Sequence, residues 1–460
     1  MFKVLKNLKE SWISVIAIVL LLVVQAAGDL TLPDYTSKIV NVGIQNGGIE
    51  NVAPDVIRKS EMENLLIFTE DDDKILASYE EISKEDLDSE EYEKLVKKYP
   101  ALENETLYRI KKISKSEQDE LDSLMAKPLM MLSTTKQMPK EQIDKMLETV
   151  NQKLDDMQES ILEQAAIQEV KNEYKAIGID TDSIQNQYII MAGLKMLGIS
   201  LIIMISAISI MCLSARVAAR LAKTLREKVF KKVLSFSNKE FSEYSTASLI
   251  TRSTNDIQQI QGLIAILFRV VVYAPIIGIG GFLRVLSQSD NSMAWIIGVA
   301  ILAILFVVAT LFIIAMPRFK KLQQLIDKLN LVTREILTGL PVIRAFNTEK
   351  KEEKRFDKAN IDLTKTNLFV NRAMSFMMPM LMLIMNGISL LIVWVGAHGI
   401  DAGTMQVGNM MAFIQYTMQI VMSFLMISMV SIMLPRASVS ANRINEIIET
   451  EETIKDSKEP

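Results

Sequence analysis

Apolar residues in this chain of 460 residues are gathered into six long stretches instead of alternating with polar residues. A helix needs about 20 mainly apolar residues to cross the hydrocarbon core of a bilayer, and each stretch reaches that length. The fourth stretch is expected to end at Pro317, because proline breaks helices. The pattern predicts an all-α membrane protein and excludes a soluble globule. The six predicted spans cover about 12–32, 188–213, 260–286, 293–316, 374–397 and 405–434.

The first stretch could instead belong to a cleaved signal peptide, because Lys3, Lys6 and Lys9 precede it. Its apolar part is longer than that of a typical cleaved signal. We therefore expect a retained span, with cleavage as the alternative.

Charge is distributed unevenly among the segments that join the spans. Residues 214–260 carry nine Lys and Arg against four Asp and Glu, and residues 316–372 carry thirteen against seven. The short segments 287–292 and 398–404 each carry one acidic residue and no Lys or Arg. Positively charged loops stay on the cytoplasmic side of a cell membrane. Both termini are therefore expected in the cytoplasm, and 33–187 outside.

The long segment between the first two spans is strongly acidic. Residues 50–183 hold 18 Lys and Arg against 33 Asp and Glu, a net charge of −15, whereas the whole chain carries −4. Its many Lys and Glu residues favour helix, so we expect a mainly helical extracellular domain, with short helices over 83–99 after an acidic break at 70–73. Apolar steps of three and four over 143–161 predict an amphipathic helix. The domain is either a solvated spacer or a gate cover or docking surface for exported cargo.

Two polar segments continue the helical pattern beyond the spans and then reverse. The helices are interrupted at 235–248 and at 339–347, which predicts two helical hairpins that project from the bilayer. Aromatic and charged residues mix at both breaks, as they do in protein interfaces. A purely structural turn is the alternative. The candidate contact residues are Phe241, Glu243 and Tyr244 in the first break and Arg344, Phe346 and Asn347 in the second.

Seven stretches carry a resemblance to a known family. They are Leu30–Tyr35, Asn41–Ile44, Leu249–Asp256, Tyr273–Gly278, Thr338–Asn347, Met411–Tyr416 and Leu434–Glu446. In this order and spacing they resemble the transmembrane half of a bacterial ABC exporter of the six-span, heterodimeric multidrug or peptide type. The resemblance covers the spans and hairpins and leaves out the insert, since the family usually joins its first two spans by a short loop.

This resemblance implies a mechanism and partners. The hairpin tips would sit in grooves of nucleotide-binding domains. The chain would work as a dimer, and the resemblance favours a heterodimer over a homodimer. Closure of those domains on ATP would turn a central cavity outward by alternating access. The cargo implied is an amphipathic drug, a lipid or a peptide.

The chain itself lacks the loop that would bind ATP. A phosphate loop needs Gly-x-x-x-x-Gly-Lys followed by Ser or Thr, and none of the 18 glycines precedes a lysine. No catalytic site and no cofactor are therefore expected here. ATP and Mg are expected in a nucleotide-binding domain that follows Pro460 or is separately encoded. The predicted division is 1–49 for the N-terminus and first span, 50–183 for the extracellular domain, 184–434 for spans two to six, and 435–460 for a linker.

Polar and charged residues within spans are candidates for a cargo cavity or gate, because they are costly in lipid. Asp29 and Lys195 fall in the outer halves of the first two spans and are predicted to pair across an outward gate, with snorkelling as the alternative. Flexible methionines can adapt to varied apolar cargo, although methionine is also ordinary filler. The complete candidate set is Gln25, Asp29, Lys195, Arg269, Met378, Met382, Gln415, Met418 and Met422.

Other classes of site and partner are disfavoured. A single cysteine and a single histidine exclude Cys-based and His-rich metal sites. An isoelectric point near 5.5 gives no reason to expect nucleic acid. Two alternatives stay open: a membrane sensor whose extracellular domain binds a peptide, and a lipoprotein-type export permease with four spans. Six spans and long hairpins argue against the permease.

Overall fold

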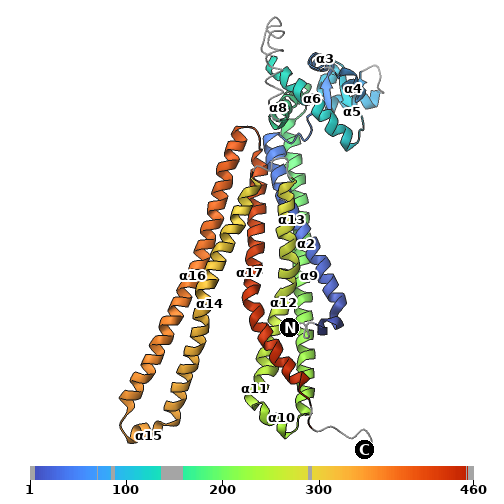
Figure 1. Cartoon of the computed structure of the whole chain (residues 1–460). Helices are drawn as coiled ribbons and strands as arrows, with labels where there is room; N and C mark the ends of the chain where they lie inside the picture. The colour runs from blue at the N-terminus through green and yellow to red at the C-terminus, as the bar shows by residue number, and fades with distance from the viewer. Residues whose placement is uncertain are drawn as a thin grey trace, which may run out of the picture.

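The computed structural model describes residues 6–69, 71–83, 89–135, 159–287, 293–451 and 453. Six helices within these ranges are long and apolar enough to cross a membrane (Figure 1), which confirms the six predicted spans. The spans are built by α2 (Trp12–Lys38), α9 (Thr181–Leu234), α12 with α13 (Ile257–Phe268 and Ala274–Leu286), α14 (Ala294–Thr338), α16 (Glu349–Asp401) and α17 (Val407–Glu449).

Two of these spans contain wider turns. The short helix η1 (Lys6–Ser11) precedes α2, which continues into a π-helix, η2 (Ile39–Gln45). In the third span the π-helix η4 (Arg252–Asp256) leads into α12, and η5 (Arg269–Tyr273) separates α12 from α13. Such turns are rare and gather at functional sites.

Pro317 does not end its helix, contrary to the sequence prediction. It lies inside α14, which continues to Thr338, and Pro379 lies inside α16 in the same way. Prolines are tolerated in membrane helices because neighbouring groups satisfy the backbone that they free.

The spans form two groups. Helices α2, α9, α12, α13 and α17 pack into one bundle, whose core includes Leu22, Leu225, Ile260 and Ile444. Helices α14 and α16 pack along each other and join that bundle through α13 and α17. They diverge from it toward the end that carries α15 (Figure 1). We call that end the tip end and the opposite end the insert end.

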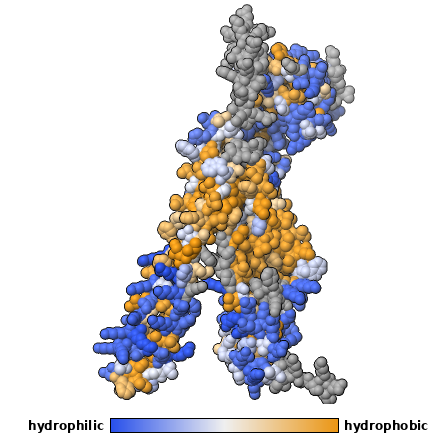
Figure 2. All heavy atoms as spheres, in the orientation of Figure 1, coloured by the Kyte–Doolittle hydropathy of each residue, from blue (hydrophilic) through white to orange (hydrophobic). Residues whose placement is uncertain are grey.

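The surface has a wide apolar belt between two hydrophilic ends (Figure 2). Large apolar side chains stand out from the belt, with exposed fractions of 71% for Met211, 72% for Ile313 and 69% for Leu390. In water such a continuous apolar surface would be unfavourable. The belt and the six helices identify a multi-pass membrane protein.

The insert between α2 and α9 contains a small sheet that the sequence did not predict. Three antiparallel strands pair in the order β1-β3-β2, with Ile57 opposite Tyr108 and Glu81 also opposite Tyr108. Helices surround it, so the domain is still mainly helical. Its elements are β1 (Val56–Arg58), α3 (Lys59–Leu66), α4 (Asp72–Ala77), β2 (Tyr79–Ile82), α5 (Ser89–Lys98), η3 (Pro100–Glu103), β3 (Leu107–Ile110), α6 (Lys115–Thr135) and α8 (Glu159–Ile177).

The insert has a hydrophobic core of its own. Met125 and Leu129 of α6 pack with Val170 of α8 and Ile57 of β1. A core of this kind indicates a folded unit, not an open spacer. The predicted stripe over 143–161 falls mostly outside the described residues, since α8 begins only at Glu159.

Both predicted hairpins are present, and each break contains short helices. The first tip comprises α10 (Asn238–Glu243) and α11 (Thr246–Thr251), between α9 and the third span. The second tip comprises α15 (Leu340–Ala345) and the two residues that follow it, between α14 and α16. Helix α17 continues beyond the expected end of its span at 434, as far as Glu449.

Candidate gate and coupling sites

The second tip presents an exposed, partly apolar surface. Proline occupies the first turn of α15, where its missing N–H costs nothing. The helix ends before Asn347, whose φ of 50° places it in the left-handed region that asparagine tolerates. Phe346 is 75% exposed, Val342 is 61% exposed, and Arg344 is exposed beside them. The three predicted residues of this tip therefore lie together on the surface.

The predicted residues of the first tip differ in their surroundings. Phe241 and Glu243 are exposed, whereas Tyr244 is half-buried. The Tyr244 ring stacks on Phe236 with 6.0 Å between centroids. The Arg252 guanidinium also lies 5.1 Å from the centroid of the Tyr244 ring. The Phe241 ring also meets Phe236 edge to face, with 6.2 Å between centroids. Of the three predicted residues, Phe241 and Glu243 are therefore the ones with surface exposed to another protein.

The first hairpin is fastened to the far end of α17. The Arg252 side chain donates to the main-chain oxygen of Arg443 at 2.7 Å and to Glu446 at 2.9 Å. Ser440 donates to buried Asp256 at 2.9 Å, and Arg443 lies 3.5 Å from the same carboxylate. Movement of this hairpin must therefore move α17 as well.

A further contact ties the first tip to the chain beyond α17. Glu240 closes a capping box with Ser237 at the start of α10 and accepts the Thr453 main-chain N–H at 3.0 Å. Hydrogen bonds from Ser237 and then Thr453 lower the pKa of Glu240 to about 2. The Tyr244 hydroxyl lies 3.0 Å from Thr450 Oγ1. Sequence reasoning missed Glu240, Arg252 and Asp256, although two of the family-like stretches contain Arg252, Asp256 and their partners.

A polar seam joins α2 to η5, α13 and α17 toward the insert end. Tyr273 donates to Asp29 at 2.6 Å, and Arg284 pairs with Asp34 at 3.1 Å. Tyr416 donates to the main-chain oxygen of Leu30 at 3.1 Å and also bonds to Asp34. Each acid of α2 is thereby satisfied by another span, as groups buried in a membrane protein must be.

Proline creates one acceptor of this seam. Pro33 has no N–H, so the carbonyl of Asp29, four residues earlier, lacks its helical partner. The side-chain amide of Gln419 donates to that carbonyl at 3.0 Å. The carbonyl that Pro33 leaves unpaired in α2 thus accepts a hydrogen bond from another span.

The seam continues to the ends of α2 and α17. Ser37 donates to Asn409 at 2.7 Å, and Asn41 donates to the same oxygen at 3.0 Å. The Gly408 N–H donates to Asn41 at 2.7 Å. A Cβ at Gly408 would stand 2.5 Å from the Ser37 main-chain oxygen, so only glycine allows this approach.

The predicted Asp29–Lys195 pair does not form within the described residues. Lys195 is exposed on α9, and Asp29 bonds to Tyr273 instead. Sequence position identified charges within two spans but could not give the rotation of their helices. Tyr273 and Tyr416 were within the family-like stretches, which was the available signal for the true partners.

The other candidates of the cavity set lie in varied surroundings. Gln25 is buried, Gln415 and Met418 are half-buried, and Arg269 is exposed within η5. Met378 and Met382 share one face of α16 and are 59% and 61% exposed. Met422 is 49% exposed on α17. These exposed methionines belong to the apolar belt, which faces lipid, cavity or partner.

Comparison with known proteins agrees with the fold. Residues 143–424, which include spans two to five and most of the sixth, match the ABC transporter transmembrane region. An uncharacterized ABC transporter ATP-binding protein of Mycobacterium tuberculosis is 37% identical over 57% of this chain and 45% of its own length. The uncharacterized ABC transporter ATP-binding protein YfiB of Bacillus subtilis is 32% identical over 56% of the chain and 45% of its length.

A third relative has a more specific name. The ATP-dependent lipid A-core flippase of Pseudomonas aeruginosa is 29% identical over 44% of the chain and 33% of its own length. The chain spans less than half the length of these curated relatives. Since the family match covers more than half of the chain, the chain belongs to the family of ABC transporter transmembrane regions.

Proposed function

We propose that this chain is one transmembrane subunit of an ATP-driven ABC exporter that moves amphipathic drugs, lipids or peptides outward. The observation that carries the proposal is the pair of helical hairpins in a chain that matches the transmembrane region of this family. The cargo classes follow the earlier resemblance, and the name of the lipid A-core flippase is consistent with them.

Energy for transport comes from nucleotide-binding domains outside the residues given. The relatives from Mycobacterium and Bacillus are named ATP-binding proteins and are longer than this chain. ATP and Mg bind there, either later in the same protein or in a partner. The second subunit of the dimer is a partner of the same family, with a heterodimer favoured by the resemblance.

The tips transmit closure of those domains to the spans. In this proposal the tip end is cytoplasmic, in agreement with the positive charge of both hairpins. The second tip offers an aromatic ring and an arginine to its partner, which are frequent anchors of protein contacts. The first tip passes its movement to α17 through Arg252 and Asp256.

The polar seam serves as the gate at the extracellular end. It holds α2 against α13 and α17 through side chains that can exchange partners with water. Opening it would separate the spans at the insert end and release cargo. In this proposal Asp29, bonded to Tyr273, is one of the gate residues.

Transport by the complete protein tests this proposal. Inside-out vesicles that contain the transporter with its nucleotide-binding domains should accumulate a fluorescent amphipathic dye or a labelled lipid only when ATP and Mg are present. A variant of those domains that cannot hydrolyse ATP is the control. Nucleotide hydrolysis that is never coupled to accumulation of any cargo class would favour a sensor instead. The 460-residue chain alone should release no phosphate above background.

A further inference from the structure

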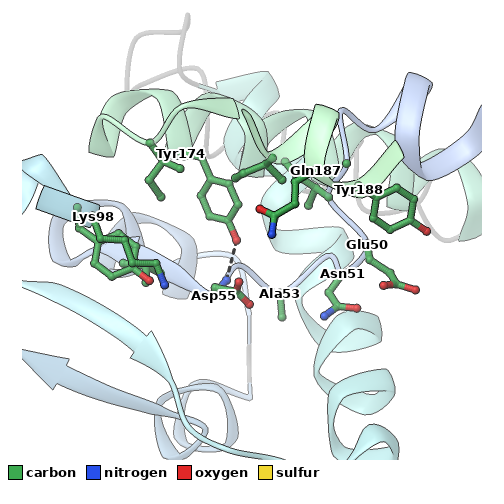
Figure 3. Close-up of a pocket in the computed structure, with 14 residues that line it drawn as sticks. Glu50, Asn51, Ala53, Asp55, Lys98, Tyr174, Gln187 and Tyr188 are labelled. Atoms are coloured by element: carbon green, nitrogen blue, oxygen red, sulfur yellow. Dashed lines mark hydrogen bonds between the residues drawn. The ribbon is translucent and has the colours of Figure 1, made fainter. Parts of the chain in front are cut away.

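A cavity of about 460 Å³ lies where the insert meets the first two spans (Figure 3). Its wall is lined by residues 48–51, 53, 55 and 56, which lead from η2 into β1, and by 179, 184, 187 and 188, before and within the start of α9. The ends of α5 and α8 supply the remainder through Lys98, Tyr99 and Tyr174. A molecule bound here would touch the insert and the second span at once.

The wall combines aromatic rings with acids and amides. Tyr99, Tyr174 and Tyr188 line the cavity, together with the carboxylates of Glu50 and Asp55. The Asp55 main-chain N–H donates to the Tyr174 hydroxyl at 2.8 Å, which fixes that ring beside the acid (Figure 3). Burial raises the pKa of Tyr174, so its ring stays neutral. Neutral tyrosine faces attract cations.

One cation of the protein, Lys98, already contacts an aromatic ring of this wall. The ammonium of Lys98 lies 5.1 Å from the centroid of the Tyr99 ring. This distance is typical of a cation–π contact. The rings of the cavity can therefore accept a positive charge without an ion-pair partner.

The two acids of the cavity are available. Both residues are exposed, and among the residues that the structure describes the Glu50 and Asp55 carboxylates form no ion pair and accept no hydrogen bond. By contrast, Glu80 and Glu173 of the same domain each hold an arginine. The net charge of −15 over 50–183 adds an attraction for cations at longer range.

We propose that this cavity is a binding site for an organic cation, a molecule with an ammonium group on a compact aromatic or aliphatic body. The ammonium pairs with Asp55 and Glu50, and the body packs against the tyrosines. Asn51 and Gln187 belong to the same wall, and their amides can form hydrogen bonds with polar substituents of the bound molecule. Neither the gate nor the coupling tips contribute to this site, so binding does not depend on the proposed transport.

Tyramine is a suitable probe, with tyrosol as the neutral analogue that has a hydroxyl in place of the amine. Binding to the full chain in nanodiscs is measured by calorimetry without nucleotide. Tyramine should bind saturably and at least about tenfold more tightly than tyrosol, since only its ammonium makes charged hydrogen bonds to the two carboxylates. Absence of saturable tyramine binding, or equal affinity for tyrosol, would overturn the proposal.

Variants place the site within the chain. Asp55→Asn combined with Glu50→Gln should weaken tyramine binding at least about tenfold. Lys98→Met should strengthen it about two- to fivefold, because it removes the competing cation from Tyr99. Glu103→Gln removes a nearby exposed acid that does not line the cavity and should leave affinity unchanged. A loss in this control as large as in the double variant would assign the attraction to overall charge and contradict the site.

Discussion

The side-chain amide of Gln419 lies 3.0 Å from the main-chain oxygen of Asp29, the carbonyl that Pro33 leaves without a partner inside α2. In this contact a glutamine of the sixth span supplies the hydrogen bond that a proline of the first span removes. It also explains why the two spans are held together near the insert end. The amide replaces a hydrogen bond that no other backbone group of α2 can supply.

The first prediction concerns this pair. Gln419→Leu should lower the free energy of unfolding in detergent by about 1–2 kcal/mol, the upper range for a hydrogen bond between membrane helices. In a Pro33→Ala background the same change should cost much less, because residue 33 then donates its own N–H to Asp29. Denaturation curves of the four variants give the coupling energy.

Gln415→Leu is the matched control, since Gln415 is half-buried one turn earlier on α17. Its cost should not depend on Pro33. Strict additivity between Gln419→Leu and Pro33→Ala would show that the two residues do not share an acceptor.

A second prediction tests whether the polar seam opens during transport. Ser37 Oγ and Asn409 Oδ1 are 2.7 Å apart, so a short bis-methanethiosulfonate reagent should bridge cysteines at these two positions through reducible disulfides. The background is Cys212→Ala, which removes the exposed native cysteine. Cross-linked transporter should lose ATP-driven transport, and reduction should restore it. Ser37→Cys alone, treated identically, should keep its activity; full transport by the cross-linked form would mean that the seam stays closed throughout.

The third prediction concerns the insert. Arg58 binds both oxygens of Glu173, at 2.9 Å and 2.7 Å, and Glu173 is only 2% exposed. Glu173→Gln should destabilise the insert by about 1.5–3 kcal/mol, the range for hydrogen bonds to charged groups. It removes the nearest counter-charge of Arg58, which then keeps only the more distant Glu105, at 3.5 Å. Hydrogen exchange of the full chain should accelerate over β1 and α8.

The exposed pair Lys59–Glu81 provides the comparison for this change. Glu81→Gln should cost less than about 1 kcal/mol, as pairs in water do. If both variants exchange alike, the Arg58–Glu173 pair does not anchor β1 to α8.

Spans and hairpins could be predicted because their signals are local. Twenty apolar residues in sequence, or a polar-aromatic break between two helical patterns, need no knowledge of distant residues. The exposed positions of Arg344 and Phe346 followed from their place in such a break.

The small sheet and the seam could not be predicted in this way. Strands of three or four residues, such as Val56–Arg58, are too short to show an alternating pattern, and their pairing partners lie about fifty residues away. Similarly, the sequence placed Asp29 within the first span, but the rotation that turns it to Tyr273 and away from Lys195 depends on the packing of whole helices. Local composition carries no information about that rotation.

The central claim is that the second tip couples ATP use to transport, and the most direct test is a paired measurement on Arg344→Ala/Phe346→Ala in the complete transporter. Both side chains are exposed, so expression and cargo binding should be unchanged. Loss of such anchors often costs about 2 kcal/mol or more in a protein contact. Cargo-stimulated ATP hydrolysis and uptake into inside-out vesicles should therefore fall together, while Lys354→Ala, an exposed change farther along α16, should leave both intact. Normal uptake and normal stimulation in the double variant would contradict the account and reduce the tip to a turn.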